Sequence, residues 1–162
     1  MNTTHIHLFL NHLPIIGSIL GGLVLAHALW TKSEMTKIAA YNLLIISSVG
    51  AVITYLTGEE AEESIENIQG ISKQLIEQHE EFALFALIAL IILGVASLLG
   101  LIITIRKSSW SKTIATITLF ISLISFGLIA KTGYMGGQIR HTELNGNTTM
   151  QDQGGTTEND ED

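Results

Sequence analysis

The sequence predicts an all-α integral membrane protein, a bundle of four membrane-crossing helices with both termini on the outer side. Three observations predict this fold. The chain of 162 residues is 47% hydrophobic and only 14% charged, whereas ordinary soluble domains are about 25% charged. It contains four long apolar stretches, and none of them alternates as a half-buried β-strand does. Lys and Arg gather in two short connections, a bias that sets orientation in a membrane.

The four apolar stretches place the expected helices at residues 13–30, 38–57, 82–105 and 113–130. A hydrocarbon core of roughly 30 Å needs about 20 residues at 1.5 Å per residue. Helices suit this environment because they satisfy their own backbone hydrogen bonds. Asn11 is expected to cap the first helix, with Pro14 in its first turn. This stretch lacks the leading positive charge of a signal peptide, so we expect a retained helix.

The connections predict the orientation of the bundle. Five of the eight Lys and Arg residues lie within 31–37 and 106–112: Lys32, Lys37, Arg106, Lys107 and Lys112. The other connection and the C-terminus are largely acidic. Trp30 and Trp110 flank the two basic connections, as interfacial aromatic residues do. The positive-inside rule therefore predicts that the basic connections face the cytoplasm and that both termini face outward.

The remaining segments define the domain boundaries. Residues 58–81 are too long for a tight turn, and their apolar residues recur at near-helical spacing. We therefore expect the second and third helices to extend beyond the membrane, with a bend at Gly70. The membrane domain is expected to cover residues 1–144. Residues 145–162 are polar, acidic and glycine-rich, which predicts a disordered tail.

Composition excludes several classes of function. The chain has no cysteine, which excludes disulfides, thiolate nucleophiles, Cys-ligated clusters and covalent c-type haem. The net charge of −7 and the absence of a basic patch argue against nucleic-acid binding. The spans contain almost no charge, whereas an ion or proton path would normally require one. No motif assigns a reaction, so whether the protein is an enzyme stays open.

Histidines and carboxylates gather where the predicted helices end on the outer side. Five of the six histidines lie there: His5, His7, His12, His79 and His141. The densest carboxylates, within 59–63 and 80–81, flank the same end. Only His27 lies near the cytoplasmic end, where a helix–helix contact or a snorkelling side chain is expected. Because histidine is the commonest metal ligand, the outer end is the candidate site.

Small residues lie near two of these histidines. Ala83, Ala86 and Leu90 share one face of the third helix with His79, by i+4, i+7 and i+11 spacing. The two alanines would leave room beside the imidazole. A second series leads along the fourth helix to the last histidine: Gly127, Ala130, Gly133 and Gly137. This series predicts either close helix packing or a slot for a flat macrocycle.

Four short motifs occur in a recognisable order. They are HLFLNHLP with His7, His12 and Pro14, TGEEAEE with Thr57 and Gly58, QHEEFA with His79, and GGQIRH with Arg140 and His141. Over about residues 5–141 they resemble the bacterial four-helix membrane family called domain of unknown function 2231. Leu8 stands where that family has a proline, Leu13 where it has an aromatic residue, and GEEAEE is richer in acids. The resemblance implies a multi-pass protein of the bacterial inner membrane, with no established reaction.

The first functional hypothesis is b-type haem. A helix bundle can hold the macrocycle between facing histidines, whose surroundings tune its potential. His12 and His79 are the expected axial pair because both lie near the same membrane boundary, with His7 and His141 as a second pair above them. The expected cofactor-binding residues are His7, His12, His79, Lys131, Arg140 and His141, with Lys131 and Arg140 toward the propionates. This site predicts an electron-transfer or redox role, with a redox protein as partner.

Two alternatives remain open. The first is a Zn, Cu or non-haem Fe site, since imidazole and carboxylate suit these metals. Its expected ligands are His7, His12, Glu59, Glu63, His79 and His141; Glu59 and Glu63 form an i, i+4 pair. The second is a structural subunit of a membrane complex without a cofactor, paired with other subunits or with a second copy. Its interfacial histidines would form hydrogen bonds near the lipid headgroups.

Overall fold

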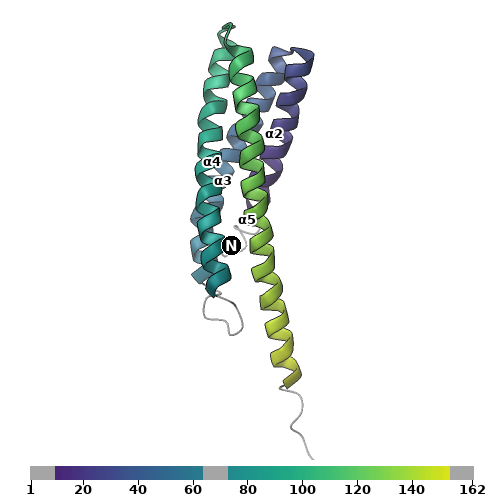
Figure 1. Ribbon diagram of the computed structural model, residues 1–162, viewed down its shortest axis with the longest axis vertical. Helices are drawn as coiled ribbons and strands as arrows, with labels where there is room; N and C mark the ends of the chain where they lie inside the picture. The colour runs from purple at the N-terminus through teal and green to yellow at the C-terminus, as the bar shows by residue number, and fades with distance from the viewer. Residues whose placement is uncertain (1–9, 64–72, 154–162) are drawn as a thin grey trace, which may run out of the picture.

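The computed structural model describes residues 10–63 and 73–153, with side chains described over 10–58, 74 and 76–138. These residues form α2 (His12–Thr31), α3 (Glu34–Glu63), α4 (Lys73–Ile105) and α5 (Ser111–Gln153), as Figure 1 shows. The all-α prediction is therefore confirmed.

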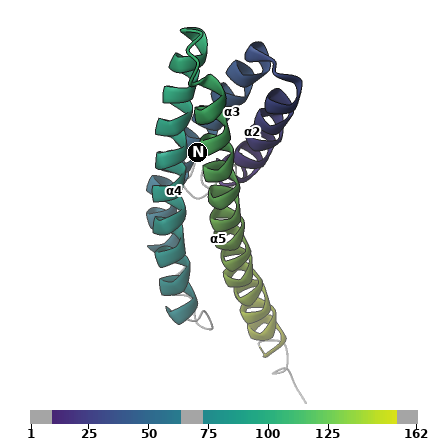
Figure 2. The same ribbon diagram turned by 45° about the horizontal axis from the view of Figure 1, so that its top comes forward.

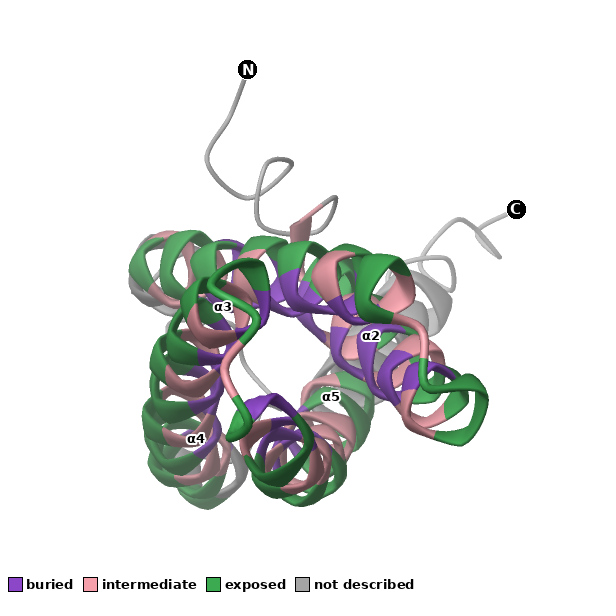
Figure 3. Cartoon of the chain, turned by 90° about the horizontal axis from the view of Figure 1, so that it is seen from above, coloured by how far each residue is buried: buried purple, intermediate pink, exposed green. Residues whose placement is uncertain are grey.

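The four helices form a closed bundle. α3 packs between α2 and α4, and α5 packs against both α4 and α2. Seen from above, the buried residues line the inward faces and the exposed residues face outward (Figure 3). Because α2 and α4 share both neighbours, they occupy opposite corners of the bundle. The four-helix bundle predicted from the sequence is present.

Each predicted apolar stretch lies inside one helix. All four helices are long and apolar enough to cross a membrane, over His12–Thr31, Glu34–Gly58, Ile76–Ile105 and Ser111–Gln138. Large apolar side chains of every helix are exposed around the bundle, such as Leu23 at 59%, Ile46 at 54%, Ile92 at 52% and Ile124 at 64%. The outer surface of the bundle is therefore apolar, as contact with lipid requires.

The connection between α2 and α3 is shorter than the sequence predicts. Lys32, with φ of 55°, ends α2, and its N–H bonds to the Ala28 carbonyl. The Ser33 hydroxyl then accepts a hydrogen bond from the Thr36 N–H at 3.2 Å, which is the geometry of a helix N-cap. The connection is therefore short, from Lys32 to Ser33. Lys37, predicted in this connection, is instead a buried residue of α3 with 4% exposure.

The far ends of the helices show a second difference. α3 continues to Glu63 and α4 begins at Lys73, so both helices run past the predicted apolar stretches. That these parts lie beyond the membrane stays a prediction, and Gly70 lies outside the described residues. α5 continues to Gln153 and passes the end of α4 in both side views (Figures 1 and 2). Residues 145–153 are therefore helical where the sequence predicts a disordered tail. Elongation adds one backbone hydrogen bond per residue, so an established helix readily continues.

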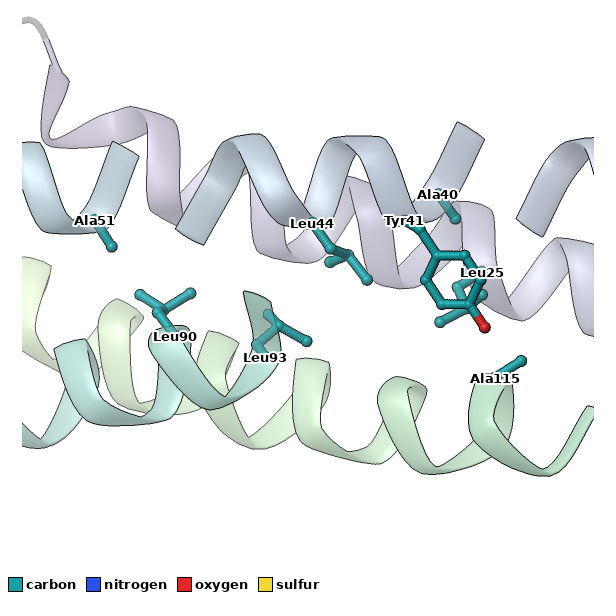
Figure 4. Packing of buried hydrophobic residues seen from close by; sticks show 8 residues of the cluster. All are labelled: Leu25, Ala40, Tyr41, Leu44, Ala51, Leu90, Leu93 and Ala115. Atoms are coloured by element: carbon teal, nitrogen blue, oxygen red, sulfur yellow. The ribbon is translucent and has the colours of Figure 1, made fainter. Parts of the chain in front are cut away.

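The core is small and closely packed. Leu25, Leu44, Leu90 and Leu93 are fully buried and face the interior from three helices (Figure 4). The ring of Tyr41 packs against Gly100 so closely that a side chain at this glycine would overlap it. Glycine at this position therefore permits the close approach of α3 and α4, as small residues do between membrane helices.

Hydroxyl groups line the rest of the interior. On α5 they recur every seven residues at buried positions: Ser111, Thr118, Ser125 and Thr132. Several interior hydroxyls donate to carbonyl oxygens of neighbouring helices, such as Ser47 to Pro14 at 3.0 Å and Ser125 to Ala89 at 3.1 Å. Such bonds between membrane helices contribute about 0.6 kcal/mol each on average. The interior therefore joins the helices by polar contacts as well as by apolar packing.

Candidate functional site

We call the end of the bundle at which α2 and α4 begin the histidine end. The candidate site at this end is built around His79. This residue lies near the start of α4, and its side chain is half-buried. Its ring packs against Gly136 of α5: a Cβ at this glycine would lie 3.2 Å from His79 Cε1 and 3.7 Å from Nδ1. Gly136 therefore provides the space that the imidazole occupies against the neighbouring helix.

A cation lies about one turn from this imidazole, on the same pair of helices. The Lys131 Nζ of α5 sits 3.7 Å from the centroid of the Phe82 ring of α4. Such a cation–π contact is worth about 0.5–1 kcal/mol at an exposed site, and Lys131 is exposed. The contact between α4 and α5 thus presents an imidazole and an ammonium group near each other. Both belong to the predicted site.

His12 lies on α2, outside the α4–α5 pair of helices. It is the first residue of α2, and its side chain is exposed. α2 occupies the corner opposite α4, and the described contact of His79 is with α5. Asn11 occupies the N-cap position, but its backbone is αR and its side chain forms no cap hydrogen bond. The predicted capping interaction is therefore wrong, because the helical conformation already begins at this residue.

The other predicted site residues lie where side chains are not described. His7 falls outside the described residues. Glu59 and Glu63 belong to the last turns of α3, and Arg140 and His141 belong to the outer part of α5. Among the described residues there is no group of three His, Cys, Asp or Glu side chains that could hold a metal ion. The described side chains therefore do not show whether the predicted metal ligands lie close together or far apart.

The two small-residue series behave differently. Ala86 and Leu90 are fully buried and Ala83 is half-buried, so the face that the sequence assigns to these residues turns toward the interior. On α5, side chains added at Gly127 or Gly137 would meet nothing within 4 Å. The glycine that contacts a histidine is Gly136, which is not in the predicted series. The rotation of α5 about its axis decides which of its glycines faces His79. That rotation depends on how α5 packs against α4.

The opposite end of the bundle contains a charged cluster that the sequence analysis does not predict. Lys37 Nζ of α3 donates to Glu34 Oε1 at 2.9 Å and to Ser111 Oγ at 3.1 Å. The Ser111 hydroxyl donates to Glu34 Oε2 at 3.1 Å and shares a 3.0 Å hydrogen bond with Thr104. The cluster joins the start of α3 to the α4–α5 turn. The i, i+3 spacing of Glu34 and Lys37 is its signal in the sequence.

A small cavity lies between α2 and α5. Its volume is about 140 Å³, and its lining is mostly apolar: Ser18, Ile19, Gly22, Leu23, Ala26, Leu119, Ser122, Leu123 and Phe126. Pockets for drug-sized ligands measure about 300–1,000 Å³. None of the described residues that line this cavity is a histidine or a carboxylate, so it is separate from the histidine end.

The motifs that carry the family resemblance occupy one end of the bundle. His12 and Pro14 lie in the first turn of α2, and His79 lies near the start of α4. Thr57 and Gly58 lie near the C-terminal end of α3. Membership of the four-span family stays a prediction from these motifs. Comparisons with protein-family models, with curated proteins and with solved structures find no match.

Proposed function

We propose that the chain is a multi-pass protein of a bacterial inner membrane, with the α2–α3 and α4–α5 turns in the cytoplasm. Two features of the turn end support this orientation. Four basic residues are exposed there: Lys32, Arg106, Lys107 and Lys112. Trp30 and Trp110, at 81% and 64% exposure, flank the same turns and suit the headgroup region. The histidine end then faces the periplasm, and the apolar outer surface contacts the lipid bilayer.

We propose further that the histidine end binds b-type haem and takes part in electron transfer. The observation that carries this proposal is the half-buried imidazole of His79 in the space left by Gly136, near Lys131. A flat ring against a helix requires such a position without a side chain. The chemistry of these groups fits haem, since imidazole ligates the iron and an ammonium pairs with a propionate. Haem, when bound, would supply one-electron transfer.

The remaining ligands come from residues at the same end. His79 would be the first residue to hold the iron, and His12, His7 and His141 are the candidates for the second. His12 has an exposed ring, so it would bind only by turning toward the bundle. Lys131 and Arg140 are the candidate propionate partners. A redox protein that meets the periplasmic end of the bundle would be the partner.

A His and Glu metal site is the second candidate function. It uses the same end of the bundle, with Glu59 and Glu63 added to His7, His12, His79 and His141. The packing of α3 against α4 favours this metal site. Glu59 and Glu63 lie at the end of α3, and α3 is a neighbour of the helix that carries His79. Zn, Cu and non-haem Fe are the metals that such ligands suit.

The purified protein distinguishes these functions. Haem gives a Soret band and α/β bands that sharpen on reduction with dithionite, whereas a metal site gives stoichiometric metal by elemental analysis without these bands. His79→Ala should abolish the bands. His27→Ala is the matched control, because His27 is exposed at the other end and packs edge-on against Trp30 at 6.1 Å between ring centroids. A protein with neither haem nor metal would support the structural-subunit alternative.

A further inference from the structure

Three buried hydroxyls in the half of the bundle near Lys37 form no hydrogen bond with the described residues. They are Tyr41 Oη, Ser97 Oγ and Thr118 Oγ1. Each of the three residues has 0% exposure, and each comes from a different helix: α3, α4 and α5. The Tyr41 hydroxyl is directed toward Thr104 without completing a hydrogen bond. Ser97 and Thr118 are therefore the two clearest cases.

The register of α4 and α5 places Ser97 and Thr118 at one level. The two antiparallel helices are joined by Thr104 with Ser111 at one point and by Ser125 with Ala89 at another. Thr118 lies midway between Ser111 and Ser125 on α5, and Ser97 lies about midway between Ala89 and Thr104 on α4. Two residues near the midpoints of the same antiparallel segment lie opposite each other.

Tyr41 lies between this level and the charged cluster. Its ring packs against Gly100, which is one turn from Ser97 and one turn from Thr104. Figure 4 shows the Tyr41 hydroxyl pointing from α3 toward the side of the interior where Ala115 of α5 lies. The polar groups therefore follow one another inward from Lys37 through Ser111 and Thr104 to Tyr41, and then to the Ser97–Thr118 level.

Leucines close this series at its inner end. Leu93 lies one turn beyond Ser97 on α4, and Leu44 of α3 lies beside it as a fully buried apolar layer (Figure 4). Beyond the leucines, Ser125 and Ser48 donate to carbonyls of α4 at 3.1 and 2.6 Å. The three hydroxyls without partners among the described residues thus lie together on one side of the leucine layer.

We propose that these hydroxyls bind water that enters from the Lys37 end of the bundle and reaches as far as the leucine layer. A buried hydroxyl without a hydrogen bond is costly, and three at adjacent levels are more so. Buried waters typically make two to four hydrogen bonds to such groups. Glu34, with 52% side-chain exposure, provides the polar entrance. This inference does not depend on a cofactor at the other end.

Thiol exchange tests the proposal, because the chain has no cysteine of its own. Thr118→Cys and Ser97→Cys each introduce one S–H group with little change in volume. The full-length variants are transferred into D₂O in lipid vesicles, and the S–H to S–D change is followed by infrared spectroscopy. Ser125→Cys is the matched control, one heptad further along the same face of α5. A thiol at Thr118 or Ser97 should exchange about tenfold or more faster than the control, which exchanges only by local opening.

Two results would overturn the proposal. Exchange at Thr118→Cys and Ser97→Cys as slow as at Ser125→Cys would show that water does not reach the unpartnered hydroxyls. Equally fast exchange at all three positions would show that the leucine layer does not stop the water. Thr118→Val gives a second measurement: loss of a hydroxyl that binds water should lower the thermal unfolding midpoint, whereas loss of a dry, unpartnered hydroxyl should leave it unchanged or raise it.

Discussion

At the scale of single residues, one glycine determines where the His79 ring can lie. Gly136 contacts the His79 ring, whereas a side chain at the adjacent Gly137 would meet nothing within 4 Å. Gly136→Val should therefore displace the imidazole and lower the haem absorbance per protein severalfold. Gly137→Val makes the same change in helix propensity and should leave absorbance unchanged. The haem absorbance of both variants, measured after the same purification, distinguishes a displaced imidazole from an effect on the helix. An equal loss of absorbance in both variants would mean that Gly136 acts through helix stability alone.

The charged cluster at the other end makes an asymmetric prediction at the same scale. Lys37 is buried, whereas Glu34 is about half exposed, with side-chain exposures of 5% and 52%. Glu34→Gln leaves an ammonium without its carboxylate and should destabilise the protein by about 1–3 kcal/mol. Lys37→Met leaves only an exposed carboxylate, so the loss should be smaller. Thermal unfolding in detergent measures both, and a larger loss for Lys37→Met would show that the ammonium is stabilised mainly by Ser111.

At the scale of helices, close approach depends on which face each glycine occupies. Gly100 faces the Tyr41 ring, and Gly127 of α5 faces open space. Gly100→Ala should force α3 and α4 apart and cost about 1–3 kcal/mol, as overpacking does. Gly127→Ala should be neutral or stabilise by up to about 1 kcal/mol, since alanine is the better helix former. Denaturation midpoints of the two variants give the comparison, and similar midpoints would contradict the packing seen at Gly100.

The same scale shows how far the sequence predicts this protein. Apolar length alone locates all four helices, because a run of about 20 apolar residues has few alternatives. That Ala86 and Leu90 share one face also follows from helical spacing. The contact between Gly136 and His79 does not follow, since it depends on the rotation of one helix against another. Burial of Lys37 does not follow either, because it requires α3 to begin directly after the Ser33 cap rather than at residue 38.

The hydroxyl series on α5 is a different case, since its signal is present in the sequence. Ser or Thr occurs every seven residues from Ser111 to Thr132. A seven-residue period marks one face of a helix that packs against neighbours. In an apolar segment, hydroxyls at that period indicate a polar interior rather than a lipid-facing surface. Apolar length therefore locates the helices, and the period of the hydroxyls indicates which face of α5 turns inward.

At the scale of the whole molecule, the prediction concerns orientation. Charge at the two ends is unequal: exposed Lys and Arg surround the turns, whereas the other end carries the carboxylates Glu77, Glu80 and Glu81. From the positive-inside rule we expect the turns in the cytoplasm and His79 outside. Single cysteines at Ser33 and Thr148 report the two ends, because the chain has no other thiol.

In intact cells, a membrane-impermeant thiol reagent should label Thr148→Cys and leave Ser33→Cys unlabelled until the membrane is permeabilised. Ser33 follows the C-cap of α2, and Thr148 lies on the outer part of α5, so the two sites are at opposite ends of the bundle. Replacing Arg106 and Lys107 with Gln should weaken the preference, because these two charges lie within the short α4–α5 turn that the rule counts. Labelling at Ser33 with protection at Thr148 would show that the protein has the reverse orientation. The histidine end would then face the cytoplasm, and any redox partner would have to be sought there.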